Sequence, residues 1–488
     1  MTTITDTTRS DGTRVAAAPT TLVGGRWYDP KLRKDVVDPV DGSIVGSVGY
    51  GGAEQAGAAA DAAAQAFADW ANTPARVRSD LLRASGQLIS ERAPRIGRLL
   101  AREAGKRLPE AVGEVSFSAE YFRWFAEQAR RPSGAVHPHE ATDRRHVTLR
   151  RPVGVVASLS PWNFPCSIQA RKLAPALAAG CTVVARVSEK APLAVTEMVR
   201  CLTDAGLPPG VVNLVHGPAG EITDAYLDHP AVRAVTFTGS TNVGRRIMAK
   251  ASQRVVRPLL ELGGNAAFVV FNDADLDAAV DGAMLAKFRN TGQSCIGANR
   301  FLVQSGVYDH FVERFAARID AMTLGSGLGD PLPDLSSCID AARADAVRSI
   351  VEQALAAGAH QVTREFDLPG PTFCAPTLLV DVPDSTALAR EEVFGPAAGV
   401  FQFDTEDEAL ARANSTEMGL AGYFYSRDAA RVWRFAEKLE VGIIGVNNAL
   451  PAVVFAPMGG VKQSGIGREG SDLGLEEFED VRYLAIGV

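Results

Sequence analysis

The sequence predicts an α/β protein made of two doubly wound domains and a small β extension. Apolar strand candidates alternate with helix candidates between residues 152 and 252, and a second series of the same kind runs from residue 267 to residue 403. Such alternation is typical of parallel sheets that are covered by helices on both faces. Segments 146–150 and 481–488 lie outside both series and have alternating or apolar character. We expect them to leave the core as strands that pair with a neighbouring subunit.

The first series is preceded by two helix candidates, the alanine-rich residues 53–70 and residues 76–104, where apolar residues recur at helical spacing. Its first strand, residues 152–159, contains the run Val153-Gly154-Val155-Val156-Ala157, which is typical of a buried strand. The other expected strands are residues 182–185, 210–215 and 232–238, and the expected helices are residues 172–179, 192–205 and 239–252.

The second series begins with strand 267–271 and with helix 273–288, for which Asp273 is a favourable N-cap. Further strands are expected at residues 301–303, 377–381 and 399–403, and helices at residues 308–322 and 341–357. The predicted parts of the chain are a flexible tail (1–20), a first α/β domain (21–133 and 153–263), a second α/β domain (264–463) and oligomerisation strands (134–152 and 478–488).

Composition and charge limit the classes of function. The 488 residues are 22% charged and 46% hydrophobic, and the formal net charge is −7. This balance argues against nucleic acid or an anionic membrane surface as the main partner. No apolar run reaches the roughly 18 residues of a transmembrane helix, and the polar residues 1–19 lack the pattern of a secretory signal. The six cysteines are scattered without paired or metal-ligand spacing, so we expect reduced thiols, a cytoplasmic protein and no metal site.

The segment Gly292-Gln293-Ser294-Cys295 is the first candidate for chemistry. A reactive thiolate needs nearby positive charge or backbone N–H groups, and a cysteine taken alone is more often a buried, inert thiol. Two upstream motifs, Pro161-Trp162-Asn163-Phe164-Pro165 and Leu260-Glu261-Leu262-Gly263-Gly264-Asn265, add an amide donor and a carboxylate. These three groups can attack an aldehyde, hold its oxyanion and hydrolyse a thioester. We therefore expect an enzyme with covalent cysteine catalysis.

Two further patterns suit a dinucleotide cofactor. The run Gly239-Ser240-Thr241-Asn242-Val243-Gly244 joins a predicted strand to a predicted helix, where backbone N–H groups can approach a pyrophosphate. An ordinary strand-to-helix turn explains this run equally well. Glu189 follows strand 182–185, where a carboxylate can hold a ribose 2′-hydroxyl and repel a 2′-phosphate, or can be a plain loop carboxylate.

Together, several motifs resemble the aldehyde dehydrogenase superfamily in their order and spacing, over nearly the whole chain after about Leu22. The motifs are Pro161-Trp162-Asn163-Phe164-Pro165, Phe237-Thr238-Gly239-Ser240, Leu260-Glu261-Leu262-Gly263-Gly264, Gly292-Gln293-Ser294-Cys295 and Glu392-Val393-Phe394-Gly395-Pro396. Within the superfamily, Lys287-Phe288-Arg289-Asn290 and residues 460–471 are most similar to succinate-semialdehyde dehydrogenases. The resemblance implies a Rossmann-like NAD(P)-binding domain, a catalytic cysteine domain, and a homodimer or homotetramer.

The resemblance also implies the roles of the catalytic side chains. Cys295 would be the nucleophile that forms a thiohemiacetal, and the Asn163 amide and the backbone N–H of Cys295 would form the oxyanion hole. Glu261 would activate the water that hydrolyses the thioester. Lys172 and Glu469 would belong to the proton-handling and support network, although Lys172 could equally form a structural ion pair.

Binding residues follow from the same resemblance. Glu392 would hold the nicotinamide ribose, and Phe394 would pack beside the nicotinamide. The implied cofactor-binding residues are Trp162, Lys172, Arg186, Glu189, Gly239, Ser240, Gly244, Leu262, Glu392 and Phe394. The implied substrate-binding residues are Arg171, Arg289, Phe164, Ala452 and Phe455, of which Phe164 could be either pocket wall or core.

Three departures from the family pattern bear on specificity. Arg186-Val187 stands where the family usually has Lys-Pro. Because a guanidinium can bind a phosphate, Arg186 leaves room for NADP, although Glu189 favours NAD. Gly297 stands where several succinate-semialdehyde enzymes have a second cysteine, so we expect no redox switch there. Ala452 stands in place of a serine that helps to hold the substrate carboxylate, with Phe455 nearby.

We therefore predict an NAD(P)-dependent oxidation of a small aldehyde to its acid, with NAD preferred and succinate semialdehyde as the first choice of substrate. The alternative is an aromatic or other non-acidic aldehyde, with Arg171 and Arg289 paired internally. Glu261 argues against a CoA-acylating reaction, which needs no activated water. The complete set of Cys295, Asn163 and Glu261 argues against a non-catalytic binding protein.

Overall fold

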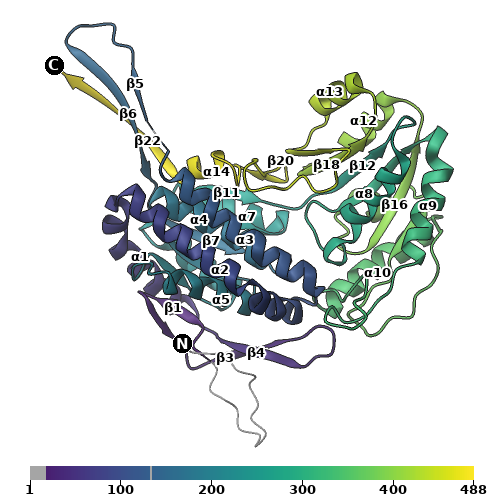
Figure 1. The fold of residues 1–488 in the computed structure, drawn as a ribbon, viewed down its shortest axis with the longest axis horizontal. Helices are drawn as coiled ribbons and strands as arrows, with labels where there is room; N and C mark the ends of the chain where they lie inside the picture. The colour runs from purple at the N-terminus through teal and green to yellow at the C-terminus, as the bar shows by residue number, and fades with distance from the viewer. Residues whose placement is uncertain (1–17, 132–133) are drawn as a thin grey trace, which may run out of the picture.

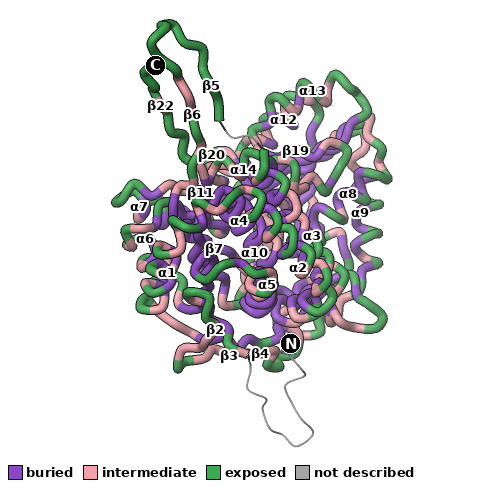
Figure 2. Tube along the Cα trace, turned by 60° about the vertical axis from the view of Figure 1, so that its left-hand side comes forward, coloured by how far each residue is buried: buried purple, intermediate pink, exposed green. Residues whose placement is uncertain are grey.

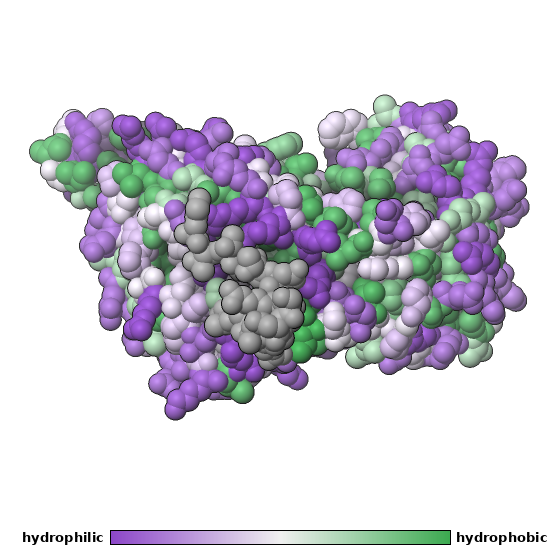
Figure 3. Space-filling view, turned by 60° about the horizontal axis from the view of Figure 1, so that its bottom comes forward, coloured by the Kyte–Doolittle hydropathy of each residue, from purple (hydrophilic) through white to green (hydrophobic). Residues whose placement is uncertain are grey.

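The computed structural model describes residues 18–131 and 134–488 and consists of two α/β lobes with a narrow sheet that projects from the first (Figure 1). The sheet of the first lobe consists of strands before Gly263 and one short strand near the C-terminus, and the second lobe is built on the strands between Ala266 and Val446. The space-filling view shows the same two lobes, with a notch in the upper outline between them (Figure 3).

The sheet of the first lobe has a parallel centre, in the order β9-β8-β7-β10-β11, with antiparallel strands at both sides. Its strands are β1 (Thr21–Val23), β2 (Arg26–Tyr28), β7 (Val155–Ser160), β8 (Thr182–Val187), β9 (Val212–Leu214), β10 (Val232–Thr238), β11 (Arg257–Glu261) and β21 (Gly465–Ile466). The strand order reverses between β7 and β10. In open α/β sheets, ligands bind outside the carboxyl ends of the strands at such a reversal.

Helices cover both faces of this sheet. One core contains residues of α2 (Ala75–Ala104), α3 (Leu108–Gln128), α4 (Pro165–Ala179) and α5 (Leu193–Asp204), and the other contains residues of α1 (Ala53–Asn72), α6 (Ala219–Asp228) and α7 (Thr241–Ser252). Val156 packs in the first core, and its neighbours Val155 and Ala157 pack in the second. Because successive side chains of a strand point to opposite faces, a sheet covered on both sides needs the continuous apolar run seen in the sequence.

The second lobe repeats this architecture in the order β14-β15-β16-β13-β12-β18-β19, where all strands but β14 run parallel. Its strands are β12 (Ala266–Val270), β13 (Ala298–Gln304), β14 (His360–Gln361), β15 (Thr377–Val380), β16 (Ala397–Phe403), β18 (Ala421–Tyr425) and β19 (Ile443–Val446). One core holds α8 (Leu276–Phe288) and α9 (Tyr308–Asp320), and the other holds α10 (Ala341–Ala356), α11 (Ala387–Arg390), α12 (Glu406–Asn414) and α13 (Ala429–Lys438). The remaining short elements are β3 (Arg33–Val37), β4 (Ile44–Gly49), β17 (Met418–Gly419), β20 (Val461–Lys462), α14 (Leu473–Glu476) and the 3-10 turns η1 (Arg289–Gly292) and η2 (Ser305–Val307).

The third sheet consists of β5 (Gly134–His137), β6 (Arg144–Pro152) and β22 (Glu479–Gly487) in the order β22-β6-β5. It projects away from the first lobe and is exposed along most of its length (Figures 1 and 2). The segments expected as strands at 146–150 and 481–488 therefore pair with each other, for example Val481 with Arg150. Pairing with a neighbouring subunit stays a prediction, as do the domain boundaries.

Several local expectations were wrong. Helix α8 is capped by Asp275, whose side chain accepts a hydrogen bond from the Ala278 N–H at 3.2 Å. Asp273 instead accepts hydrogen bonds from the Ser426 hydroxyl and from two backbone N–H groups after it, all at 2.9 Å. Helix α4 begins seven residues before the expected position, at Pro165. Residues 1–17 of the predicted tail lie outside the described residues, and Thr20, which falls within its predicted bounds, is buried and hydrogen-bonded to Asp29.

Candidate functional site

Cys295 lies where two cavities meet between the lobes. One cavity, of about 590 Å³, is lined by residues of α3, α4 and the end of α8, and we call it the aldehyde pocket. The other, of about 220 Å³, lies at the reversal point of the first sheet, and we call it the cofactor cavity. Cys295 lines both. A nucleophile at this junction can react with a molecule held in one cavity while a second molecule occupies the other.

An unusual backbone presents Cys295 to these cavities. Asn290, Thr291 and Gly292 have φ angles of 53°, 55° and 72°, in the left-handed region that non-glycine residues seldom adopt. Such conformations cost about 1–3 kcal/mol each and persist only where the surroundings enforce them. Here the Gln293 side chain accepts the Ile339 N–H at 2.9 Å and donates to the Asn290 carbonyl at 3.2 Å. The turn before Cys295 is thus locked from both sides.

Asn163 follows β7 and is buried beside this turn. Its amide nitrogen donates to the Gln293 carbonyl at 3.3 Å, and its backbone carbonyl accepts the Asn290 side-chain amide at 3.0 Å. An amide nitrogen carries two N–H donors, so one stays available to an oxygen bound next to Cys295. Asn163 also lines the cofactor cavity.

Glu261 ends β11 and is buried behind the cavity walls, since it lines neither cavity. Its two carboxylate oxygens have no hydrogen-bond partner among residues 18–131 and 134–488. Burial raises the pKa of Glu261 to about 8; Glu469 adds to the rise, and Arg171 and Lys172 oppose it. A carboxyl group with this pKa can take up or release a proton near neutral pH.

The thiol of Cys295 is itself neutral in this arrangement. Burial raises its pKa to about 12; Glu392 adds to the rise, and Arg171 opposes it. Because the thiolate is the nucleophile, the thiol must lose its proton as it attacks.

Lys172 and Glu469 form a buried network with Arg171. The Glu469 carboxylate lies 2.5 Å from Arg171 Nε and 2.6 Å from Lys172 Nζ, and Lys172 also donates to the Thr236 hydroxyl at 3.0 Å. These two cations lower the pKa of Glu469 against the effect of its burial. The structure therefore brings Lys172 and Glu469 together, as an ion pair behind Glu261.

The cofactor cavity gathers predicted residues from the carboxyl ends of β7, β10 and β11. The predicted residues that line it are Trp162, Gly239, Ser240, Leu262, Glu392 and Phe394. Glu392 accepts the Gly264 N–H at 3.3 Å, and burial raises its pKa to about 7, against the effect of this hydrogen bond. The Trp162 and Phe394 rings meet edge to face at 5.4 Å. A polar group, a helix N-terminus and aromatic walls fit a nicotinamide nucleotide. Thr238 of the Phe237-Thr238-Gly239-Ser240 motif lines this cavity too, as does Arg343, to which no motif in the sequence points.

Arg186 and Glu189 lie outside the lining of this cavity, at the end of β8. The Glu189 carboxylate accepts the Tyr50 hydroxyl at 3.0 Å and lies 3.1 Å from Lys34 Nζ and 3.7 Å from Arg186 Nη2. These contacts lower the pKa of Glu189 although burial opposes them. The carboxylate is thus charged and held in place by the β3–β4 hairpin. Gly244 lines no described cavity, and an added Cβ there would meet Leu262.

Of the predicted substrate residues, Arg171, Arg289, Phe164 and Ala452 line the aldehyde pocket. Phe455 does not; its side chain is 62% exposed and packs near the Trp124 ring. The pocket also contains Arg107 and Glu110 of the α3 start, which the sequence analysis missed. No spacing in the sequence connects them with Arg289.

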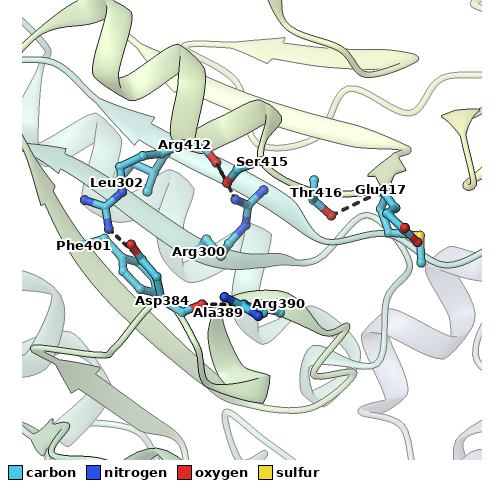
Figure 4. Close-up of a pocket in the computed structure, with 11 residues that line it drawn as sticks. Arg300, Leu302, Asp384, Ala389, Arg390, Phe401, Arg412, Ser415, Thr416 and Glu417 are labelled. Carbon is cyan, nitrogen blue, oxygen red and sulfur yellow. Dashed lines mark hydrogen bonds and ion pairs between the residues drawn. The ribbon is translucent and has the colours of Figure 1, made fainter.

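A cavity of about 620 Å³ in the second lobe is lined by several arginines but by none of the predicted site residues (Figure 4). Arg300 donates there to the carbonyls of Asn265, Arg412 and Ala413, and Arg412 pairs with Asp384 at 2.9 Å. Two of these carbonyls end helix α12, where a cation is favoured. These contacts indicate that Arg300 and Arg412 have a structural role.

Within 18–131 and 134–488, no group of three or more His, Cys, Asp or Glu side chains is placed to hold a metal ion. Over the same residues, no helix has both the length and the apolar character needed to cross a membrane.

The sequence and the fold match proteins of one family. The model of the aldehyde dehydrogenase family matches residues 27–484. Succinate-semialdehyde dehydrogenase [NADP(+)] GabD of Escherichia coli (strain K12) is 42% identical over 96% of this chain and 97% of its own. Glutarate-semialdehyde dehydrogenase of Pseudomonas aeruginosa is 42% identical over 95% of this chain and 97% of its own.

Solved structures agree and confirm the predicted fold class. An NADP-dependent enzyme of E. coli superposes with a TM-score of 0.95 at 41% identity, over 96% of this chain and 98% of that chain. A betaine aldehyde dehydrogenase of Staphylococcus aureus in complex with NAD+ superposes with a TM-score of 0.92 at 33% identity, over 95% and 94% of the two chains.

Proposed function

Because the chain belongs to the aldehyde dehydrogenase family, we propose that it oxidises an aldehyde with a distal carboxylate, with succinate semialdehyde as the first choice, to the carboxylic acid. The family and the enzyme class predicted from the motifs, an NAD(P)-dependent aldehyde dehydrogenase, are confirmed. The observation that carries the proposal is Cys295 at the junction of two cavities. The names of the semialdehyde-oxidising relatives and the position of Arg289 in the aldehyde pocket support the choice of substrate.

In the first step, the Cys295 sulfur forms a bond to the aldehyde carbon, and the carbonyl π electrons move to its oxygen. The side-chain amide of Asn163 and the backbone N–H of Cys295 donate to this oxyanion, and a preorganised donor of this kind is worth about 2.7–4 kcal/mol. The thiol proton leaves to a base. When bound, the nicotinamide supplies the hydride acceptor that turns the thiohemiacetal into a thioester.

Hydrolysis of the thioester needs a general base. Glu261 is suited to this task because its pKa is raised to about 8 and its oxygens are free among the described residues. Since Glu261 lines neither cavity, it acts through a water or after its side chain turns toward Cys295. Attack of the water breaks the carbon–sulfur bond, releases the acid and restores the thiol.

The two catalytic roles can be separated by kinetics. Cys295→Ala should abolish turnover, and Glu261→Gln should release one equivalent of NADH in a burst and then stall as an acyl-enzyme, about 10²–10⁴-fold slower in steady state.

The hydrolysis rate of the wild type should rise with pH through about 8, because Glu261 becomes a base above its pKa. Rapid mixing and mass spectrometry measure these quantities. Cys201→Ala, at a buried cysteine outside both cavities, is the control. Steady turnover by Cys295→Ala would contradict the proposal.

The substrate's tail tests the choice of aldehyde. Arg289→Ala should lower the ratio of kcat/KM for succinate semialdehyde to that for butanal, by roughly 10- to 150-fold, because a hydrogen bond to a charged group is lost. Arg171→Ala should reduce both values, since it leaves Glu469 with one cation fewer. A wild type that prefers butanal or benzaldehyde would instead favour a non-acidic aldehyde.

For the cofactor, we propose that NAD is preferred over NADP. Glu189 is the observation behind this choice, because a charged carboxylate at the end of β8 suits a ribose 2′-hydroxyl and repels a 2′-phosphate. Lys34 and Arg186 partly offset its charge. Two curated relatives are named for NADP(+), and the proposed preference for NAD therefore rests on this chain's own residues.

Two variants with opposite signs test this choice. Glu189→Gln should raise kcat/KM for NADP relative to NAD by roughly tenfold or more, because the repulsion is lost. Lys34→Gln should lower the same NADP-to-NAD ratio, since the negative charge of Glu189 would lose one of the cations that offset it. The measurement is steady-state kinetics with both cofactors. A wild-type preference for NADP would overturn the proposal.

We also propose a homodimer or homotetramer that assembles through the projecting sheet. The exposed apolar side chains there include Val136, Leu149, Val481 and Tyr483. Val136 and Leu149 lie on one face of this sheet, and Val481 and Tyr483 lie on the other. Isolated apolar residues are common on surfaces, but apolar residues exposed on both faces of a thin projecting sheet favour a partner. The cytoplasm is the proposed location, since all six cysteines are free thiols.

Assembly can be tested by light scattering after size-exclusion chromatography. Val481→Asp should shift the wild-type oligomer toward monomer, because a buried charge opposes the contact. Val255→Asp, at an isolated and 91% exposed position, should leave the mass unchanged. A monomeric wild type would contradict the proposed assembly.

A further inference from the structure

The aldehyde pocket is lined by three guanidinium groups that differ in their existing contacts. Arg171 is nearly buried, and its Nε lies 2.5 Å from the Glu469 carboxylate. Its charge is therefore balanced inside the protein. Arg289 is exposed, lies over the Phe164 ring with its guanidinium carbon 5.2 Å from the ring centre, and forms no ion pair within residues 18–131 and 134–488. Its charge is available to a ligand.

Arg107 is the third of these groups. Its side chain is 29% exposed, and its Nε is buried without a hydrogen-bond partner among the described residues. Its ion-pair contact is to Glu110, whose Oε1 lies 3.9 Å from Arg107 Nη1, beyond hydrogen-bond distance. The guanidinium of Arg107 thus lines the pocket with unused donors.

The backbone at Arg107 is held firmly. Arg107 is the N-cap residue of α3, and the next N–H, that of Leu108, donates to the Gly327 carbonyl at 2.9 Å. The preceding residue, Lys106, is buried in an ion pair with Glu114, which in turn accepts the Cys166 N–H at 2.9 Å at the start of α4. A fixed backbone with a free side-chain end reduces the ordering cost of binding.

Glu110 connects Arg107 to Arg289. Its Oε1 accepts the backbone N–H of Asn290, the residue after Arg289, at 3.4 Å. Glu110 thus contacts the Arg107 guanidinium and the backbone next to Arg289. Asp334 is a further acidic residue of the lining. The positive charge of Arg289 still has no ion-pair partner among the described residues. An anionic group of a ligand would balance that charge.

We propose that Arg107 acts together with Arg289 to bind the distal carboxylate of the aldehyde, while Arg171 positions Glu469. This inference rests on the proposed acidic substrate. A carboxylate has two oxygens that can accept paired N–H donors, and arginine presents such pairs. Arg107 supplies donors in a pocket where Ala452 has no hydroxyl.

The decisive measurement is the ratio of kcat/KM for succinate semialdehyde to kcat/KM for butanal. Arg107→Ala should lower this ratio by roughly 10- to 150-fold, with most of the loss in KM for the acidic aldehyde. Arg107→Lys should restore part of it, because charge returns without the planar fork. Arg130→Ala, at an exposed arginine beyond the same helix and outside the pocket, should leave the ratio unchanged.

Glu110→Gln provides a test with the opposite sign. The amide oxygen can still accept the Asn290 N–H, while the negative charge between the two arginines is removed. The ratio should rise by roughly two- to fivefold. A variant that simply disturbs the fold cannot improve specificity.

The outcomes separate this inference from the proposed function. If the wild type prefers succinate semialdehyde but Arg107→Ala leaves the ratio unchanged, Arg107 has no part in binding and the substrate proposal stands. An equal loss with both aldehydes overturns the inference too, since Arg107 then only supports the structure. If the wild type prefers butanal, the acidic substrate and this inference both fail.

Discussion

The ion pairs of Glu469 are the interaction on which the rest of the site depends. Its carboxylate is 1% exposed and lies between the cations of Arg171 and Lys172. Loss of one partner from such a buried group costs about 3–5 kcal/mol, because a charge is left uncompensated. The contact ties the C-terminal segment to α4 across 297 residues of sequence and, through Lys172 and Thr236, to β10. The negative charge of the same carboxylate helps to raise the pKa of Glu261. Its ion pair also balances the charge of Arg171, which is then less available to a ligand.

The arrangement of charge explains why the half-buried Cys295 can be unreactive at rest and still serve as the nucleophile. A neutral thiol next to Glu392 and Glu261 is protected from premature reaction, and only Arg171 among its main neighbours favours the thiolate. The strained turn at Asn290 and Thr291 does not activate the sulfur electrostatically; it fixes the sulfur at the junction of the two cavities. Position rather than a lowered pKa is therefore the contribution of this loop, and proton transfer is left to a separate base.

Much of the fold could be predicted from the sequence because the signals are local. Strand β7 and the turn at Gly239 follow from strand periodicity and the needs of a strand-to-helix turn, although β7 begins at Val155 and not at residue 152 as predicted. The end of α8 at residue 288 agrees with the prediction, but its start could not be predicted, because Asp273 and Asp275 are both good caps and tertiary hydrogen bonds from residues 426–428 decide between them. Within the site, the strand-end motifs were found, whereas contacts between distant segments, such as Lys34 with Glu189, leave no spacing to detect. For the same reason the exposed position of Phe455 could not be foreseen.

The site divides its tasks between different kinds of element. The groups proposed for chemistry come from strand ends and from the turn before Cys295. There, neighbouring strands and side-chain hydrogen bonds hold each group in place. The charged groups proposed to bind the substrate's tail come instead from the start of α3 and the end of α8, and they line the aldehyde pocket, which Glu261 does not. Within the described residues, the hydrogen bonds that hold Asn163 come from Gln293 and Asn290. They do not come from the side chains of Arg107 or Arg289, so these two charges can change without removing those hydrogen bonds. Selectivity for an acidic aldehyde is thus separable from the oxidation itself, which is the physical reason why one fold can serve relatives named for aldehydes as different as succinate semialdehyde and betaine aldehyde.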